Sequence, residues 1–268
     1  MSRPVTSPDD ISKEQFSQLL GQYDSLIQTL SGSTTSKPGT RTLQELDQFR
    51  YEEAVAAFSS SKPTRQMTHD DVKTLVEWKL RHGKFRPTLM SLVSSNASAN
   101  VANTIQSALA QYWKTKDADA ALKTISSLKG VGPATAALLL SVHDPEDVIF
   151  FSDEAFWWLC CGGQKRPIKY SPKEYQALRG AARVLSKRLE VGATDIEKVA
   201  YVLFKGEVAP ESGPVADKRP KPSAGKTQPR AATKTAEAAP ETGTKRKPAN
   251  GGDEHASTGV RRSKRGKT

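Results

Sequence analysis

The sequence predicts an all-α protein, and three observations carry this prediction. Over residues 12–206 the apolar residues recur at intervals of three and four, which is the spacing of one face of a helix. Ser or Thr followed three residues later by a carboxylate, a pattern that begins helices, recurs between these apolar segments. The one β-prone stretch, residues 147–151, is short and isolated. We therefore expect nine or ten helices in residues 12–206, arranged as two helical lobes that face one another.

Each helix is placed by its apolar face and its end signals. The first, over residues 16–30, has an apolar face, and the Ser- and Gly-rich stretch 31–39 separates it from the remainder. Further starts are predicted from capping boxes, in which a hydroxyl and a carboxylate satisfy free N–H groups of a first turn, at Thr42/Glu45, Thr68/Asp71, Ser171/Glu174 and Thr194/Glu197. Prolines are expected at first helical positions and glycines at C-terminal caps, as at Pro87, Pro133, Pro172, Gly83 and Gly192.

The two ends of the chain differ from this helical domain, which we place at residues 12–207. Residues 1–11 are expected to be a flexible N-terminus. Residues 208–268 hold no aromatic residue, and they hold 14 of the 40 lysines and arginines but 6 of the 29 acidic residues. Because so few apolar side chains cannot offset the ordering entropy, we expect a disordered basic tail. Its clusters 245–247 and 261–265 are typical of nuclear-import signals and predict a nuclear protein that binds an import receptor; a solubilising tail is the alternative.

Several classes of function are disfavoured by the composition. No apolar run is long enough to cross a membrane, and residues 1–12 lack the apolar core of a signal peptide, so we expect no membrane partner. Cys160 and Cys161 are adjacent and the four histidines show no ligand spacing, so we expect no metal. The sequence contains no glycine fingerprint of a nucleotide phosphate site, so we expect no cofactor. Nothing resembles a heptad array, so we expect a monomer. The net charge of +11 favours an acidic partner such as nucleic acid.

The segment 125–140 carries the strongest functional signal. Two apolar-faced helices are joined there by a Gly-Val-Gly turn, in which glycines let the backbone approach a phosphate that N–H groups of the second helix can bind. Such a turn contacts the backbone of double-stranded DNA and gives no sequence specificity. A glycine-rich turn that only joins two packed helices is the alternative. The candidate nucleic-acid-binding residues of this turn are Lys129, Gly130, Val131, Gly132, Ala134 and Thr135.

This segment resembles the helix-hairpin-helix motif of the DNA glycosylase superfamily. In that superfamily the motif leads through a loop to a catalytic Asp, and the residue that matches here is Asp153. The resemblance implies a carboxylate that activates water and stabilises oxocarbenium-like charge as a flipped base departs. The position that holds Lys in bifunctional members is Ala134, which implies monofunctional base excision. The loop before Asp153 is longer than the usual pattern, so Glu154 is a rival. A helix-capping role for Asp153 or Ser152 explains the local residues equally well.

Two basic stretches extend the candidate interface. Arg179, Arg183 and Lys187 repeat every four residues on one helix face and could follow a phosphate backbone, although an ordinary solvated face is the alternative. Residues 77–87 gather basic and aromatic residues near a predicted helix end. With the hairpin and the segment 152–155, this stretch is similar to a group of eukaryotic proteins without an established activity, over roughly residues 40–190.

The sequence therefore favours a DNA-binding protein, with monofunctional base excision by Asp153 as the more specific hypothesis. The alternative is a non-enzymatic module that holds DNA or a chromatin partner. The two differ at Asp153, because an enzyme needs an open pocket above this carboxylate and a binding module does not. A third possibility is a protein-interaction element that binds no nucleic acid.

Overall fold

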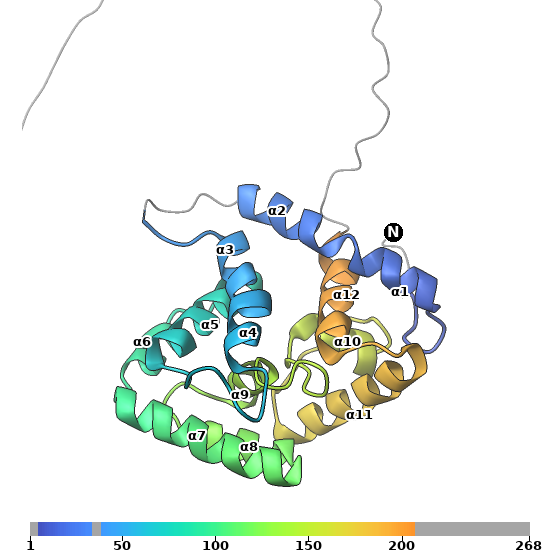
Figure 1. The fold of residues 1–268 in the computed structure, drawn as a ribbon. Helices are drawn as coiled ribbons and strands as arrows, with labels where there is room; N and C mark the ends of the chain where they lie inside the picture. Colours follow the sequence, from blue (N-terminus) through green and yellow to red (C-terminus); the bar gives the residue numbers. More distant parts are fainter. Residues whose placement is uncertain (1–4, 34–38, 207–268) are drawn as a thin grey trace, which may run out of the picture. The chain divides into compact units, whose positions relative to one another are not determined.

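The computed structural model describes residues 5–33 and 39–206, and helices joined by loops make up this part of the chain (Figure 1). No strand occurs in it, so the all-α prediction is confirmed there. Within these residues the structure has twelve α-helices and one π-helical segment instead of the expected nine or ten helices, in part because the helix expected over residues 16–30 is broken in two. The basic tail and its import-like clusters lie outside the described residues.

The N-terminal helix predicted over residues 16–30 is two helices, α1 (Lys13–Leu20) and α2 (Tyr23–Ser33). The chain turns at Gly21, and both helices pack against α12 (Ala193–Lys205) (Figure 1). A capping box of Ser12 and Gln15 begins α1. The sequence prediction missed it because Gln, and not a carboxylate, closes the box.

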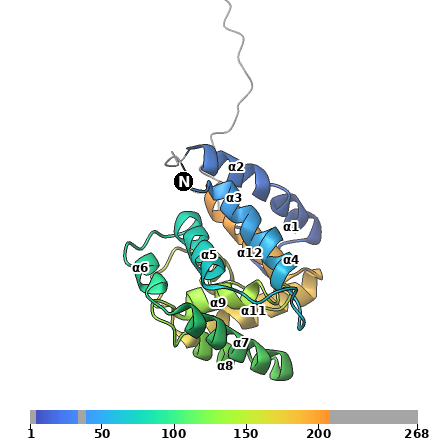
Figure 2. The same ribbon diagram turned by 60° about the vertical axis from the view of Figure 1, so that its left-hand side comes forward.

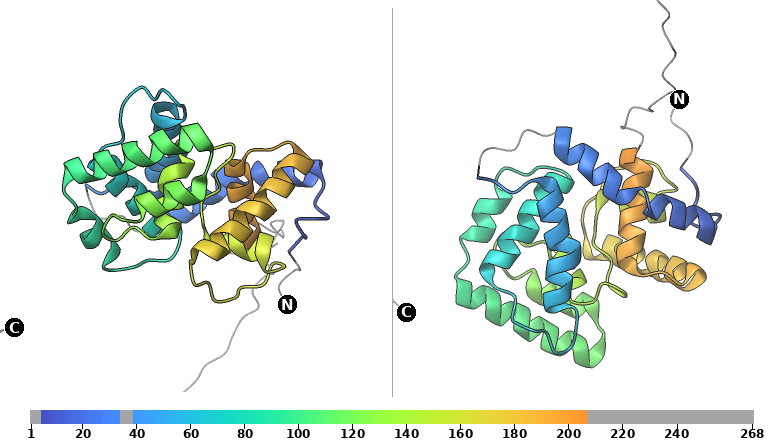
Figure 3. Two further views of the ribbon diagram at one scale, coloured as in Figure 1. Left: turned by 90° about the horizontal axis from the view of Figure 1, so that it is seen from below. Right: turned by 45° about the horizontal axis from the view of Figure 1, so that its top comes forward.

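Three consecutive segments form one rod: α3 (Leu43–Gln48), the π-helical turn η1 (Phe49–Glu53) and α4 (Ala54–Phe58) (Figure 3, right). The π-helical turn places Arg50 in the core, where its guanidinium donates to Oγ of Ser141 at 2.6 Å and lies 3.3 Å from Oε2 of Glu197. This buried pair joins the rod to α12 (Figure 2).

Among the remaining helices, α9 lies near the middle of the view in Figure 1, and its residues 134–141 are all buried. A helix that is apolar on all of its faces is typical of the centre of a helical domain. The chain reaches α9 through α5 to α8 and leaves it through an extended buried segment to α10. These helices are α5 (His69–His82), α6 (Leu89–Ser94), α7 (Ser98–Thr115), α8 (Ala118–Ile125), α9 (Pro133–Ser141), α10 (Asp153–Cys160) and α11 (Pro172–Leu189).

The predicted helix starts at Thr42, Thr68 and Ser171 are confirmed, each with both hydrogen bonds of its capping box. Pro133 and Pro172 are first helical residues, and Gly83 follows the last residue of α5, also as predicted.

Three end signals were wrong. Thr194 and Glu197 form no capping box, because Glu197 is turned into the core toward Arg50 and the Thr194 hydroxyl donates to the carbonyl of Pro145. Gly192 is the N-cap of α12 and not the C-terminal cap of α11. Glu190, in the left-handed conformation, already ends α11. Pro87 precedes α6 by two residues. In the first case a tertiary contact competes with the local signal and prevails.

Packing contacts begin before residue 12. Ile11 is fully buried, and the carbonyl of Thr6 accepts a 2.8 Å hydrogen bond from Nε1 of Trp158 in α10. Arg188 of α11 donates to the carbonyls of Pro8 and Ile11 at 2.6 and 2.9 Å. The described part of the N-terminal segment is therefore held against α10 and α11.

Candidate nucleic-acid interface

The turn between α8 and α9 depends on one glycine. Gly130 has φ +76°, a region that disfavours side chains, and a Cβ built there would lie 2.8 Å from Cβ of Leu92 and 3.1 Å from the backbone N of Val93. Val131 is 5% exposed, so its side chain packs under the turn. The second glycine is different: Gly132 is exposed, its φ is −97°, and a Cβ there would meet nothing within 4 Å.

Asn96 fixes this turn from the other side. Its Oδ1 accepts the backbone N–H of Lys129 at 2.9 Å, and its Nδ2 donates to the carbonyls of Lys129 and Val93 at 3.0 and 2.9 Å. The Lys129 side chain stays exposed. Sequence reasoning missed Asn96, since it lies 33 residues from its partner and carries no local signal.

The N-terminus of α9 has no side-chain cap. Gly132 is its N-cap and offers no side chain, and Pro133 has no N–H, so the amides at the helix start find no side-chain acceptor within the described chain. Ala134 and Thr135 are 7% and 4% exposed, so the side chains of these two predicted residues are buried. An uncapped helix start attracts anions because of its free N–H groups and the helix dipole.

Two cationic residues from distant parts of the chain share a cavity with this helix start. The cavity has a volume of about 220 Å³. Its walls come from α5, from the segment after it, from the turn with the first residues of α9, and from Tyr170. The lining residues are Lys79, Arg86, Leu89, Gly130, Gly132, Pro133, Ala134, Thr135 and Tyr170. The Arg86 guanidinium lies over the Tyr170 ring, 5.1 Å from its centroid. Free amides and two cations thus meet in one concave surface, which is the chemistry of an anion site.

Lys79 was not among the predicted site residues, although it lies in the noted stretch 77–87. Its side chain makes no hydrogen bond or ion pair with any described residue. Burial and, to a lesser degree, the neighbouring positive charge of Arg86 lower the pKa of Lys79 to about 8. A bound anion would stabilise the charged form of Lys79, because it would offset both the burial and the repulsion from Arg86.

Asp153 lies next to this surface. It is the first residue of α10, and the capping role predicted for it or for Ser152 belongs to Ser152, whose Oγ accepts from the N–H of Ala155 at 3.1 Å. Oδ1 of Asp153 accepts a 2.6 Å hydrogen bond from the hydroxyl of Tyr170. Burial and this carboxylate raise the pKa of Tyr170 well above its ordinary value, so the phenol stays a donor.

The space beside Asp153 is small. A cavity of about 20 Å³ is lined by Asp153, Tyr170, Lys79 and Arg86 among others, so it shares three residues with the cavity at the helix start. This volume holds about one water molecule and no nucleobase. Glu154, the rival carboxylate, is 4% exposed and pairs with Lys205 of α12 at 3.4 Å.

The predicted basic stripe lies on α11, away from the helix start. Arg179 pairs with Asp119 at 3.1 Å, and Asp119 belongs to the first turn of α8, whereas the candidate turn follows the last turn of that helix. Arg183 and Lys187 are exposed. The structure therefore does not bring the stripe into the cavity formed by Lys79, Arg86 and the turn.

The stretch 77–87 divides into a core part and a surface part. Trp78 is fully buried and stacks on His82 with ring centroids 4.4 Å apart, so it belongs to the core. Phe85 is 70% exposed, between two cationic residues, Lys84 and Arg86, that both line the small cavity beside Asp153.

Comparison with known proteins found no relative: no family model, no curated protein and no solved structure matches the chain. Among the helices that the structure describes, none is long and apolar enough to cross a membrane. Within the same residues, no three His, Cys, Asp or Glu side chains are gathered where they could hold a metal ion.

Proposed function

We propose that this protein binds double-stranded DNA through the sugar-phosphate backbone, with the turn 129–135 as the contact. One observation carries the proposal: the uncapped start of α9 shares a cavity with Lys79 and Arg86. A phosphate there would accept from backbone amides and be neutralised by two cations. We propose in addition that α8, the turn and α9 form a helix-hairpin-helix element, as the sequence resemblance implies, within a two-lobed helical domain.

The donors at this surface explain why binding would not depend on base sequence. Backbone N–H groups and long cationic side chains contact phosphates, whereas sequence is read by groups that reach base edges. Lys129 is exposed beside the turn and would add a second phosphate contact. Phe85 offers an aromatic face to an unstacked base, since base stacking on an aromatic ring is tolerant of sequence.

Gly132→Asp tests this proposal because the structure leaves room for the side chain. The new carboxylate would occupy the anion position and repel phosphate, and we expect duplex affinity to fall about tenfold or more and the salt slope to decrease by about one. Binding is measured by fluorescence polarisation of a labelled duplex between low and moderate salt.

The matched control is Gly32→Asp. Gly32 is an exposed glycine of α2 where a Cβ would also meet nothing within 4 Å, so the two variants change net charge equally. Equal affinity and equal salt slope for both variants and the unchanged protein would refute the DNA-backbone proposal, and would favour a protein-interaction role for the turn.

Monofunctional base excision is the second candidate, and the position of Asp153 favours it. Its carboxylate lies beside a cavity that holds about one water and shares Lys79, Arg86 and Tyr170 with the proposed phosphate site. The position that holds the Schiff-base lysine in bifunctional members is Ala134 here, so the product would be an abasic site and not a cleaved strand. The small cavity and the Tyr170 hydrogen bond favour the non-enzymatic module. A flipped base could reach Asp153 only if this cavity widened and the hydrogen bond broke.

The two candidates are separated by incubating the protein with duplexes that carry uracil, hypoxanthine, alkylated, oxidised or etheno bases, followed by alkali. Strand breaks with the unchanged protein and none with a folded Asp153→Asn variant would establish base excision and identify its substrate. Retained salt-sensitive binding without breaks on any duplex would leave the DNA-binding module. A nuclear location and an import-receptor partner are proposed from the basic clusters 245–247 and 261–265 alone.

A further inference from the structure

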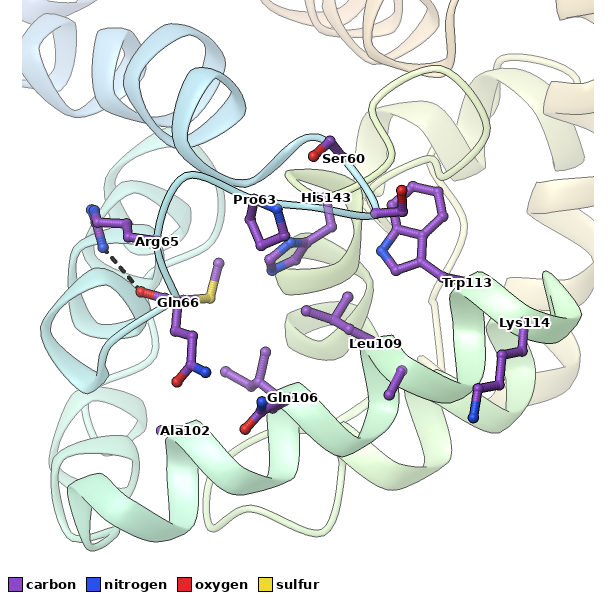
Figure 4. Close-up of a pocket in the computed structure, with 14 residues that line it drawn as sticks. Ser60, Pro63, Arg65, Gln66, Ala102, Gln106, Leu109, Trp113, Lys114 and His143 are labelled. Atoms are coloured by element: carbon purple, nitrogen blue, oxygen red, sulfur yellow. Dashed lines mark hydrogen bonds between the residues drawn. The ribbon is translucent and has the colours of Figure 1, made fainter.

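A second cavity lies at the opposite end of α9 and belongs to no part of the proposed DNA site. It has a volume of about 570 Å³, within the range of small-molecule sites. Its walls come from the loop after α4, from one face of α7 and from His143, which follows the last residue of α9 by two positions (Figure 4). The larger apolar side chains among its walls are Pro63, Met67, Ile105, Leu109 and Trp113.

His143, which lines this cavity, has one buried polar atom without a partner in the described structure. His143 is 2% exposed, and its Nδ1 lies 3.0 Å from the carbonyl of Phe58. A carbonyl only accepts, so Nδ1 carries the proton and Nε2 of the neutral ring presents a lone pair. Nε2 is fully buried without a hydrogen bond in the described structure. Burial lowers the pKa of His143 to about 4, so the ring stays neutral at physiological pH.

We propose that this cavity binds a small neutral aromatic molecule that donates one N–H or O–H to Nε2 of His143. The apolar walls would hold the ring, and the single acceptor would fix its orientation. A buried acceptor without a partner is costly, and a donor on the ligand would remove that cost. Such a site, with a mostly apolar lining and one placed polar group, is typical of small-molecule recognition.

The charged residues around the cavity favour a neutral ligand. Arg65 is held by two hydrogen bonds to Asp71, at 2.6 and 2.8 Å, so its charge is already compensated. Lys114 is exposed at the edge of the cavity. The C-terminal residues 207–268 offer no suitable occupant, because they contain no aromatic residue and no Leu, Ile or Met.

The first test uses the full-length protein and two probes of nearly equal shape, indole and 1-methylindole. Indole carries the N–H donor and 1-methylindole does not. We expect isothermal titration calorimetry to give a dissociation constant about tenfold lower for indole, the effect of one buried hydrogen bond. Equal affinity for the two probes, or no binding of either up to its solubility limit, would overturn the proposal.

Two variants locate the binding. Ala110→Trp places a large side chain in the opening of the cavity from an exposed position of α7, and we expect it to abolish indole binding. Ala99→Trp, at an exposed position of the same helix that does not line the cavity, is the control and should bind indole unchanged. Loss of binding in neither variant or in both would place the probe elsewhere and overturn the proposal.

His143→Phe tests the acceptor. It keeps an aromatic ring of similar size and removes Nε2, so indole and 1-methylindole should bind it equally. If this variant does not fold, the ¹⁵N chemical shift of Nε2 of His143 in the unchanged protein gives the same information. That resonance should move on addition of indole and stay fixed with 1-methylindole; no movement with indole would refute the hydrogen bond.

Discussion

The cavity at the α8–α9 turn and the cavity beneath residues 59–67 lie at the two ends of one buried helix, α9. At the N-terminal end the helix presents free amides, joined by the cations Lys79 and Arg86, so this end offers donors and positive charge. At the other end, His143 offers a neutral acceptor within apolar walls. The ends of a helix carry opposite partial charges, and here each end is supplemented by side chains of the same character.

The two cavities also differ in where their polar groups are exposed. The donors at the turn border open space around Gly132, which suits a macromolecular phosphate backbone. The acceptor at the other end is covered by neighbouring atoms, so only a small molecule that displaces this cover can reach it. Substitutions at one end should therefore leave binding at the other unchanged, and the following predictions test that independence.

The largest effect is expected from Gly130→Val. The left-handed backbone costs a branched residue about 1–2 kcal/mol, and the clash with Leu92 and Val93 adds about 1–3 kcal/mol, so we expect a loss of about 4 kcal/mol in the free energy of unfolding. Gly132→Val, with an ordinary φ and no neighbour within 4 Å, should lose less than about 1 kcal/mol. Urea denaturation compares the two; equal losses would contradict the assigned roles of these glycines.

The next effect is the pH dependence caused by His143. The unfolded chain protonates this ring near pH 6.5, whereas the folded protein resists protonation down to about 4. Between these values the unfolded state binds more protons, so the contribution is complete above pH 6.5 and is lost as the pH falls toward 4, by up to about 3 kcal/mol. Denaturation at pH 7 and pH 4.5 should show this loss in the unchanged protein and a smaller one in His143→Phe. Parallel behaviour of both proteins would exclude the buried neutral ring as the cause.

A smaller effect is expected from Phe85→Ser. If the exposed ring stacks on a base, its removal should weaken binding to a duplex with an unpaired base by about 1–2 kcal/mol. Binding to a fully paired duplex should change less. Val184→Ser, which removes another exposed apolar side chain from α11, is the control. A uniform loss on both duplexes would indicate that Phe85 does not contact bases.

The smallest effect is the pH dependence caused by Lys79. Its pKa of about 8 means that the ammonium loses its proton as the pH rises from 7 to 9, and a phosphate contact is lost with it. We expect duplex affinity to fall several-fold over this interval, equivalent to about 1 kcal/mol. Lys79→Arg keeps its charge and should bind with little dependence on pH, as measured by polarisation at constant ionic strength. Identical pH profiles would remove Lys79 from the interface.

The sequence predicted local features well where the neighbours in the chain decide them. Three capping boxes and the helix starts at Pro133 and Pro172 need only residues within one turn, and they are confirmed. The pair Thr194 and Glu197 shows the limit of such reasoning. The local pattern is the same, but the buried Arg50 guanidinium pairs with Glu197 and, within the described residues, with no other carboxylate.

The candidate site divides in the same way. The sequence by itself determined the helical class, the tight turn at Gly130 and the start of α9 at Pro133, because periodicity, glycine at positive φ and proline at a first helical position are local properties. Only the tertiary structure decided that Lys79, Arg86 and Tyr170 meet this turn, that Asp153 has room for about one water, and that Nε2 of His143 lies buried in an apolar cavity. These residues are brought together by packing across large separations in the chain, and the burial that sets their pKa values and hydrogen bonding exists only once the helices are packed.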